Sequence, residues 1–235
     1  FTRGDDREAV EENYRRMAAA LGVETESLTL TWQTHTVNVR KVTWEDRGKG
    51  VSRERDYRDV DGLVTDVPGI TLVTFFADCV PLYFLDPVRK AIGLSHSGWR
   101  GTAARMGQKT LEKMRAEFGT DPNDVIACVG PSICGDCYEV GKEVAAVFAE
   151  EFGPRWEREI LRPGVRPGKY QLDLWKANEA VLLEAGITPD HLHVTDICTC
   201  CNPDYLYSHR KMGEKRGNLC AFLALKSPFF GQKYL

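Results

Sequence analysis

Three short segments of the sequence each place a soft or borderline metal ligand in or beside an apolar run. The ligands are His35, Cys79 and His96. Three protein ligands without an obvious fourth are the number expected of a catalytic zinc ion, which keeps one coordination position open for water or substrate. The sequence therefore predicts metal-assisted chemistry at this His/Cys/His set.

The neighbours of these ligands favour metal binding over a purely structural role. Asp78 stands beside Cys79 in an otherwise apolar stretch. An unpaired carboxylate would be costly there, so we expect a cationic, metal-bound or hydrogen-bonding partner. His96 lies between a predicted buried strand and a glycine-rich helix start, where free backbone N–H groups favour an anion. The pattern indicates a metal beside an anion site.

Two other places in the chain are candidates for anion binding or proton transfer. Arg100 falls in the first turn of the predicted helix, where its charge opposes the helix dipole and a bound phosphate would justify it. The alternative is that Trp99 packs and Arg100 only reaches solvent. His209 and Arg210 stand in a glycine-containing segment and could bind an anion or transfer a proton. The alternative there is a solvated loop.

The chain has eight cysteines but no export signal, which favours reduced thiols and metal ligation over a disulfide framework. Cys134 and Cys137 form a CxxC pair. Far downstream, residues 198–201 contain three more cysteines, which we do not interpret as a second such pair at zinc-finger spacing. A closed four-cysteine zinc site built from both groups is a weaker alternative.

Length, composition and charge limit the classes of protein to which the chain can belong. A length of 235 residues fits one large domain, residues 1–235. The net charge of -3 and the pI near 6.0 lack the basic field of a nucleic-acid-binding protein, so a small-molecule ligand fits better. No apolar stretch approaches the roughly 20 residues that span a bilayer, and no signal peptide is evident. We therefore expect no membrane partner and a cytoplasmic protein; a homodimer fits the prevalence of two-fold assemblies.

Hydrophobic periodicity predicts more strands than helices, in irregular alternation. Helices are expected at residues 10–21, 98–118, 140–148 and 174–182. Strands are expected at residues 28–32, 36–42, 62–65, 70–76, 80–85, 91–95, 125–129, 191–194 and 219–225. Residues 46–59 are expected to form an exposed loop or hairpin tip, and residues 156–169 a loop. This order favours a layered α/β (α+β) fold with mixed β-sheets over a doubly wound parallel sheet.

Several motifs together are typical of one family. They lie at residues 33–35, 61–65, 77–79, 96–101, 130–133, 137–138, 173, 178 and 198–210. On these motifs the chain resembles the bacterial YlmD/YfiH proteins, also described as laccase-domain or multicopper polyphenol oxidase-like and related to the human purine enzyme FAMIN. Two departures stand out: Arg3 adjoins Gly4 where family members usually carry a glycine-, serine- and asparagine-containing stretch, and Thr36 replaces a frequent glycine.

The resemblance implies a four-layer α/β/β/α sandwich and a zinc ion held by His35, Cys79 and His96. It also implies phosphorolysis of adenosine, inosine and S-methyl-5'-thioadenosine, together with adenosine deamination in the same site. The expected ligands are purine nucleosides and phosphate. The zinc trio is the one that the residues themselves predict.

A mechanism follows as a hypothesis. For deamination, zinc would activate water for attack on purine C6, with Asp78 transferring protons. For phosphorolysis, phosphate held by Arg100 and Arg210 would attack ribose C1′. His209 would protonate the departing purine.

Three other functions stay open at this stage. A His/Cys set also suits Cu2+, so a polyphenol oxidase is one alternative, although five histidines are few for a multicopper enzyme. A cysteine hydrolase with Cys79 as nucleophile and His96 as base is the second. The third is a non-enzymatic zinc module that recruits a fourth ligand from Cys198, Cys200 or Cys201.

Overall fold

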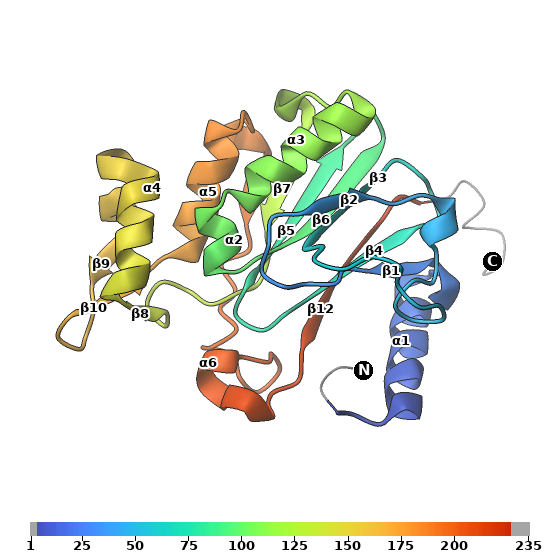
Figure 1. Ribbon diagram of the computed structural model, residues 1–235, viewed down its shortest axis with the longest axis horizontal. Coiled ribbons are helices and arrows are strands. Elements are labelled where there is room, and N and C mark those ends of the chain that lie inside the picture. The colour runs from blue at the N-terminus through green and yellow to red at the C-terminus, as the bar shows by residue number, and fades with distance from the viewer. Residues whose placement is uncertain (1–3, 227–235) are drawn as a thin grey trace.

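Two β-sheets pack face to face, and helices cover the outer face of each, in the computed structural model, which describes residues 4–226 (Figure 1). Helix α1 lies on the smaller sheet, and α2, α3 and α5 lie on the larger one. The layers are therefore α/β/β/α, and the predicted mixed α/β sandwich is confirmed.

The larger sheet has six strands and mixed pairing. In spatial order its strands are β11 (Leu192–Val194), β7 (Ile126–Val129), β5 (Val80–Asp86), β6 (Ala91–Ser97), β3 (Gly62–Thr65) and β2 (Val39–Lys41). The two outer pairs are parallel and the four central strands are antiparallel. The smaller sheet consists of β1 (Leu28–Leu30), β4 (Thr71–Phe76) and β12 (Leu219–Ala224), with β4 in the middle.

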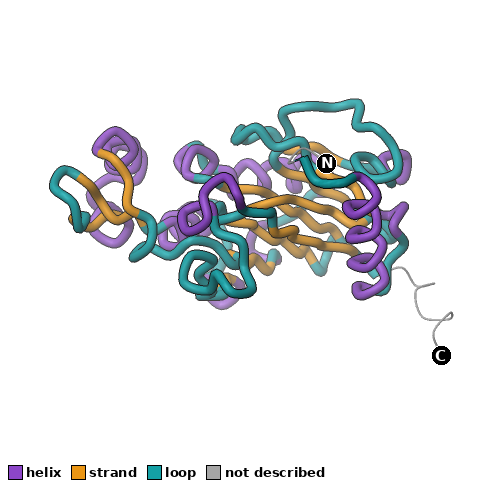
Figure 2. Tube along the Cα trace, turned by 90° about the horizontal axis from the view of Figure 1, so that it is seen from below, coloured by secondary structure: helices purple, strands orange, loops and turns teal. Residues whose placement is uncertain are grey.

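Helices and a third, small sheet complete the described residues. The helices are α1 (Arg7–Leu21), α2 (Trp99–Ala103), α3 (Met106–Phe118), α4 (Lys142–Ile160), α5 (Leu174–Glu184) and α6 (His209–Met212). The small antiparallel sheet is formed by β8 (Glu139–Gly141), β10 (Lys169–Leu172) and β9 (Leu161–Pro163). Short 3₁₀ turns lie at Thr25–Ser27, Trp44–Asp46, Pro122–Asp124, Pro189–His191 and Gly213–Lys215. Figure 2 shows α4 and the small sheet at one end of the molecule and α1 at the other.

The core explains why the central strands read as continuous apolar runs. Leu63, Leu72 and Leu94 are fully buried between the two sheets, whereas Leu82 and Phe84 are buried between the larger sheet and its helices. A strand covered on both faces needs apolar residues at successive positions rather than alternating ones. Each such side chain stabilises the fold by about 1.5–3 kcal/mol relative to an exposed one.

Predicted element boundaries are wrong near two helix breaks. The single helix expected from residue 98 to 118 is divided into α2 and α3, because Arg105 between them adopts a left-handed conformation with φ 61°. Its guanidinium pairs with Glu151 and Glu184, at 2.5 and 2.7 Å, which holds the break in place. The spacing of hydrophobic residues continues through this break, so the sequence pattern does not reveal the break.

The predicted loop at residues 156–169 is also wrong. Helix α4 continues to Ile160 across a kink at Gly153, and β9 and β10 follow as a hairpin. Pro154 inside the helix follows a glycine with φ 62°, so the chain restarts a helix rather than leaving it. Val140, expected in a helix, belongs to β8.

The segment at residues 46–59 is not uniformly exposed as predicted. Asp46 and Lys49 are buried, and the Lys49 ammonium lies 2.7 Å from the Asp46 carboxylate. Tyr57 is also buried and donates its hydroxyl to the Leu30 carbonyl at 2.5 Å. Paired charges and this aromatic ring attach the segment to the smaller sheet.

Helices long and apolar enough to cross a bilayer are absent from residues 4–226. The junction of Arg3 and Gly4, where the family's extra stretch is missing, involves residues outside that range.

Candidate functional site

Three separate elements bring the predicted metal ligands together. His35 lies in the turn between β1 and β2, Cys79 in the turn between β4 and β5, and His96 on β6. One ligand atom from each side chain lies within 4.8 Å of the others. The two imidazole rings meet edge to face, with centroids 5.1 Å apart. The trio predicted from residue types is thus a spatial cluster.

Asp61 organises this cluster, although sequence reasoning assigned it no role. Its fully buried carboxylate accepts backbone N–H bonds from Thr34, His35 and Thr36 at 2.9–3.1 Å. It also lies 2.8 Å from Nδ1 of His96. One side chain therefore fixes the turn that carries the first ligand and the ring orientation of the third, which leaves Nε2 of His96 for a metal.

Close packing at Gly98 allows the three ligands to approach. A Cβ atom at this position would lie 2.9 Å from the Cys79 sulfur and 3.2 Å from the His35 ring. Any larger residue would therefore displace a ligand. His35 and Asp78 adopt left-handed backbone conformations, with φ of 64° and 85°, that are unfavourable for residues other than glycine. Such geometry persists only where the surrounding structure imposes it.

The electrostatics of the cluster favour its charged forms. Burial opposes ionisation of Cys79, but the neighbouring His96 and His35 lower its pKa to about 6. Burial likewise opposes protonation of His96, yet Cys79 and Asp61 raise its pKa to about 9. Asp61 itself has a lowered pKa, because His96 and the Thr34 amide outweigh its burial. A thiolate is the state in which Cys79 binds a metal.

Asp78 has the hydrogen-bonding partners that its apolar setting predicts. One oxygen accepts the Thr199 hydroxyl at 2.7 Å, and the other accepts the backbone N–H of Arg210 at 2.6 Å. The Asp78 carbonyl accepts the amide of Ile133 at 3.0 Å. The residue next to the second ligand thus holds two distant segments of the chain against the cluster.

Tyr138 connects the predicted arginines to this region. The Arg210 guanidinium lies 5.1 Å above its ring and donates to the carbonyls of Cys137 and Glu139. Burial raises the pKa of Tyr138 to about 12; the Cys79 thiolate adds to this rise, and Arg210 and Arg100 oppose it. Arg100 lies over the ring of its neighbour Trp99 at 4.2 Å. Trp99 is partly buried and Arg100 is exposed, which fits the alternative in which Trp99 packs; the phosphate-binding role of Arg100 stays a prediction.

His209 begins α6 and contacts a residue that sequence reasoning did not single out. Its Nδ1 accepts a hydrogen bond from Nε of Arg216 at 3.3 Å. Arg216 also donates to the side chain of Asn218. Arg216 and Asn218 both line the cavity described next, whereas His209 does not.

A cavity of about 420 Å³ opens onto the metal ligands. Its walls include His35, Cys79 and His96, the aromatic rings of Trp32, Phe75 and Phe76, and the polar side chains named above. Arg55 lies over the Trp32 ring at 4.4 Å and belongs to the same wall. A cavity that combines aromatic walls with convergent polar groups is suited to a small-molecule ligand.

Residues 1–226 match the family described as multi-copper polyphenol oxidoreductase laccase. The chain belongs to this family. The YlmD/YfiH resemblance is thereby confirmed, because relatives and structural neighbours carry those names.

The relatives have purine names. Purine nucleoside phosphorylase YlmD of Bacillus subtilis is 34% identical over 222 residues, which cover 92% of this chain and 77% of that protein. A purine nucleoside phosphorylase of Deinococcus radiodurans is 37% identical, covering 95% and 80%. Adenosine deaminase RL5, from an unknown prokaryotic organism, is 33% identical, covering 91% and 81%. These names support an enzyme that acts as a purine nucleoside phosphorylase does.

Solved structures agree with the fold. The hypothetical protein YfiH of Bacillus licheniformis has a TM-score of 0.90 at 33% identity, covering 95% of this chain and 83% of that one. YlmD of Geobacillus stearothermophilus has a TM-score of 0.87 at 35% identity, with the same coverage. The four-layer arrangement is thus shared with these structures.

The donor set suits a catalytic metal. Two imidazoles and one thiolate form a three-ligand set, their open side faces the cavity, and a buried carboxylate holds one imidazole from behind. The cluster can therefore bind a metal ion.

Proposed function

We propose that this chain is a zinc-dependent purine nucleoside enzyme. It phosphorolyses adenosine, inosine and S-methyl-5'-thioadenosine to the free base and the ribose 1-phosphate or its methylthio analogue, and it deaminates adenosine to inosine. Residues 1–235 work as one domain. The observation that carries the proposal is the His35/Cys79/His96 cluster in the wall of an aromatic-lined cavity, in a family whose members bear purine nucleoside names.

Zinc would be held by the thiolate of Cys79 and the imidazoles of His35 and His96. When bound it would supply Lewis-acid chemistry and lower the pKa of water to about 7. Asp61 keeps His96 in the tautomer that leaves Nε2 for the metal, and its bonds to the first turn keep His35 in place.

The purine would lie against the aromatic wall. Trp32, Phe75 and Phe76 line the cavity together with the ligands, and aromatic rings bind a flat heterocycle by stacking and apolar contact. Arg216 and Asn218 would contact the polar edge of the nucleoside. The cavity volume of about 420 Å³ lies within the range of small-molecule sites.

Phosphate would bind beside Tyr138. Arg210 lies on this ring, and Arg100, in the first turn of α2, would supply the second guanidinium group. They would hold phosphate for attack on ribose C1′, while the bond from C1′ to the purine breaks. Guanidinium groups suit this task because they form paired hydrogen bonds to phosphate oxygens.

Proton transfer falls to His209 and Asp78. Since Nδ1 of His209 accepts from Arg216, the ring would carry its donor proton on Nε2. Because His209 does not line the cavity, donation to the departing purine would require its ring to move towards the cavity. Asp78 would carry protons during deamination. This requires one of its oxygens to exchange the Thr199 hydroxyl or the Arg210 amide for the reacting group.

A copper-dependent polyphenol oxidase is the second candidate, since the family description names that activity. Multicopper chemistry needs several copper ions with mainly histidine ligands. Of the five histidines, His35 and His96 belong to the cluster, whereas His191 is only partly exposed and bonds to the backbone carbonyl of Asn123. This ligand set favours the nucleoside enzyme. A cysteine hydrolase would use Cys79 as a free nucleophile, which its place among the ligands disfavours.

The test is product analysis with matched variants. Zinc-loaded wild type, His96→Ala and the surface control His193→Ala are incubated with adenosine, with and without phosphate. Chromatography then separates inosine, adenine and hypoxanthine. We expect phosphate-dependent free base and inosine from wild type and His193→Ala, and neither from His96→Ala. Absence of purine products from all three proteins, together with copper-dependent oxidation of a polyphenol, would replace the proposal by the oxidase.

A further inference from the structure

Four cysteines form a second cluster outside the site described above. Cys134 and Cys137 come from the connection between β7 and β8, and Cys198 and Cys201 follow β11. All four sulfur atoms lie within 4.8 Å of one another. From the sequence this arrangement was only a weaker alternative, because Cys198 and Cys201 were not counted as a CxxC pair, although two residues separate them as in the upstream pair.

Backbone pairing brings the two CxxC segments side by side. Ser132 forms a parallel bridge with Cys198: its amide donates to the Ile197 carbonyl, and its carbonyl accepts the Thr199 amide, each at 3.1 Å. Cys198 is buried at the centre of this arrangement, whereas Cys201 is exposed. Two CxxC turns placed together by a main-chain bridge are the usual scaffold of a four-cysteine zinc site.

Backbone amides already point at the buried sulfur. The N–H groups of Cys134 and Cys201 donate to Sγ of Cys198 at 3.3 and 3.4 Å. Such bonds stabilise sulfur as a thiolate, which is the ligand form. The hydrogen bonds thus prepare a thiolate next to three further thiols.

The sulfur spacing suits a metal ion better than a disulfide framework. Tetrahedral zinc with bonds of about 2.3 Å separates its sulfur ligands by roughly 3.8 Å. The Cys137 and Cys201 sulfurs lie 3.4 Å apart, well beyond the roughly 2.05 Å of a disulfide. All four sulfurs also lie within 4.8 Å of one another, whereas a disulfide would involve them only in pairs.

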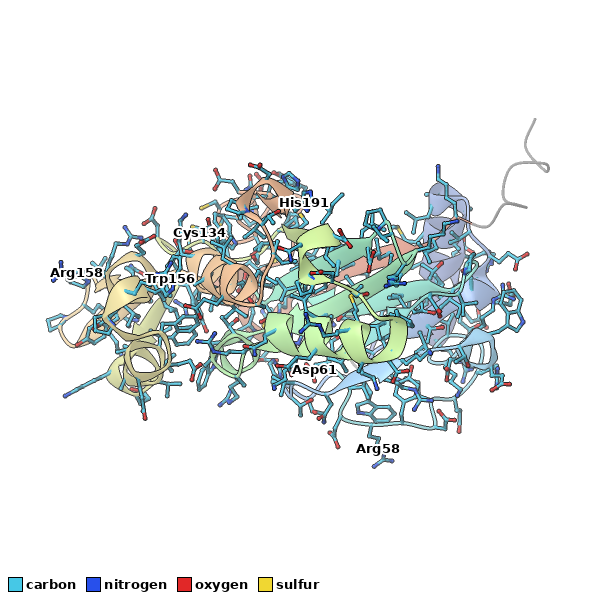
Figure 3. The ribbon with its side chains drawn as sticks, turned by 90° about the horizontal axis from the view of Figure 1, so that it is seen from above. Arg58, Asp61, Cys134, Trp156, Arg158 and His191 are labelled. Atoms are coloured by element: carbon cyan, nitrogen blue, oxygen red, sulfur yellow. The ribbon has the colours of Figure 1, made fainter. Side chains whose placement is uncertain are left out.

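We propose that Cys134, Cys137, Cys198 and Cys201 bind a structural zinc ion, separate from the metal at His35, Cys79 and His96. Figure 3 shows Cys134, from the four-cysteine cluster, and Asp61, which contacts His96 of the first cluster, at separate places in the molecule. The four cysteines close the coordination sphere, so this zinc has no open position for substrate.

The second zinc holds the C-terminal segment against the catalytic cluster. Thr199 lies inside the downstream CxxC turn and donates to Asp78, and Ile133 precedes Cys134 and donates to the Asp78 carbonyl. Both segments that bind the zinc are therefore bonded to the residue beside Cys79. This zinc is a positioning element for the site rather than part of its chemistry.

The first experiment counts metal in purified wild type, Cys137→Ser, Cys201→Ser, His96→Ala and the control Cys200→Ser, after incubation with zinc and desalting. Cys200 is the matched control because it lies in the same turn but outside the group of four. We expect about two zinc ions per chain in wild type and Cys200→Ser, and about one in each of the other three. The count does not depend on which substrate the enzyme uses.

Cobalt substitution of wild type covers the case in which the serine variants do not fold. Co2+ bound by four thiolates has strong sulfur-to-metal absorption that survives in His96→Ala. One zinc per chain in wild type and none in His96→Ala would overturn the proposal, as would a Cys137–Cys201 disulfide found by peptide mass mapping of protein purified without reductant. Iron retained by the four cysteines in place of zinc would overturn the identity of the metal.

Discussion

A single buried carboxylate, that of Asp61, links the first and third metal ligands. It bonds to the amide of His35 and to the ring of His96, so it acts on two ligands that arise from different elements. Carboxylates behind ligating histidines orient the ring and increase its basicity. The geometry of the cluster therefore depends on a residue that does not itself bind the metal.

Replacing Asp61 by asparagine should weaken zinc binding by about 10–100-fold, because the amide loses the charge and one of the acceptors that hold the turn and the ring. Competition with a chromophoric chelator measures this affinity. Asp66→Asn, an exposed acid just beyond the same strand, is the control. Equal affinities of Asp61→Asn and wild type would show that the contacts to Asp61 do not determine ligand geometry.

Gly98→Ala should reduce phosphorolysis by about a hundredfold, since a new Cβ at 2.9 Å from the Cys79 sulfur forces a ligand to move. Gly101→Ala is a matched control in the next helical turn, because its Cβ would meet nothing closer than 3.6 Å. Steady-state kinetics and zinc content measure both variants. If the two variants have equal activity, close packing at Gly98 does not limit the site.

At this scale the sequence predicted ligands but not the residues behind them. The chemistry of imidazole and thiolate is evident from residue type, so His35, Cys79 and His96 could be named in advance. The roles of Asp61, Tyr138 and Arg216 arise from contacts across long sequence separations. No local pattern distinguishes a buried orienting aspartate from an ordinary one.

The segment between β2 and β3 shows how an element can depend on paired charges. Asp46 accepts from Lys49, Thr43 and Arg40, and Lys49 also contacts Asp56. Burial would raise the pKa of Asp46, but its bonds to Lys49 and Thr43 outweigh this and lower it. The ionised carboxylate thus stabilises the fold.

Asp46→Asn should lower the free energy of unfolding by about 3 kcal/mol at pH 7, because it leaves a buried ammonium with weaker compensation. The folded pKa lies below the unfolded value of about 3.9, so the stabilisation is fully present above that pH. It is lost as the pH falls through the folded value. The difference between variant and wild type should therefore shrink towards pH 3.

Urea unfolding followed by circular dichroism at pH 7 and pH 3 measures this difference. Asp56→Asn is the control, because it removes the other acidic partner of Lys49. The Asp56 side chain is 65% exposed, so this variant should lower the free energy of unfolding by less than about 1 kcal/mol. A constant difference at both pH values would mean that packing rather than charge explains the loss.

Elements were predictable where burial is uniform and less so where the backbone changes direction. The strands β3 to β6 follow from continuous apolar runs, which only a doubly covered sheet requires. The break at Arg105 depends on ion pairs from α4 and α5, and the kink at Gly153 joins two helical runs. The ion pairs at Arg105 are not local, and a helix that restarts after Gly153 changes the backbone direction, so periodicity alone places these boundaries wrongly.

For the whole molecule, bound metal should add measurably to stability. A metal that binds only the folded chain at about a thousand times its Kd stabilises it by about 4 kcal/mol. For a protein of this size, chelation should therefore lower the Tm by about 10 °C. Differential scanning fluorimetry with and without a chelator measures this shift.

The double variant His96→Ala/Cys201→Ser tests the source of that stability, because it lacks one ligand from each cluster. The chelator should leave the Tm of the double variant unchanged. It should lower the Tm of each single variant by part of the decrease seen in wild type. If the chelator lowers the Tm of the double variant as much as that of wild type, the stabilising metal binds at neither cluster.

The layered architecture followed from family resemblance more than from periodicity. Alternating strands and helices indicated mixed sheets, but the partition into three sheets depends on which strands pair. Strand β12 pairs with β4 across most of the chain, and no local signal specifies that partner.

The pairing of β12 with β4 also determines when the smaller sheet can be completed during synthesis. The hydrogen-bonding edge of β4 (Thr71–Phe76) that β12 covers over six residue pairs is made first, whereas β12 (Leu219–Ala224) is made much later. At ribosomal elongation rates this apolar edge waits on the order of ten seconds for its neighbour. A nascent chain with such an exposed strand edge can pair with another copy of the chain. We therefore expect chaperones to be needed mainly before β12 leaves the ribosome.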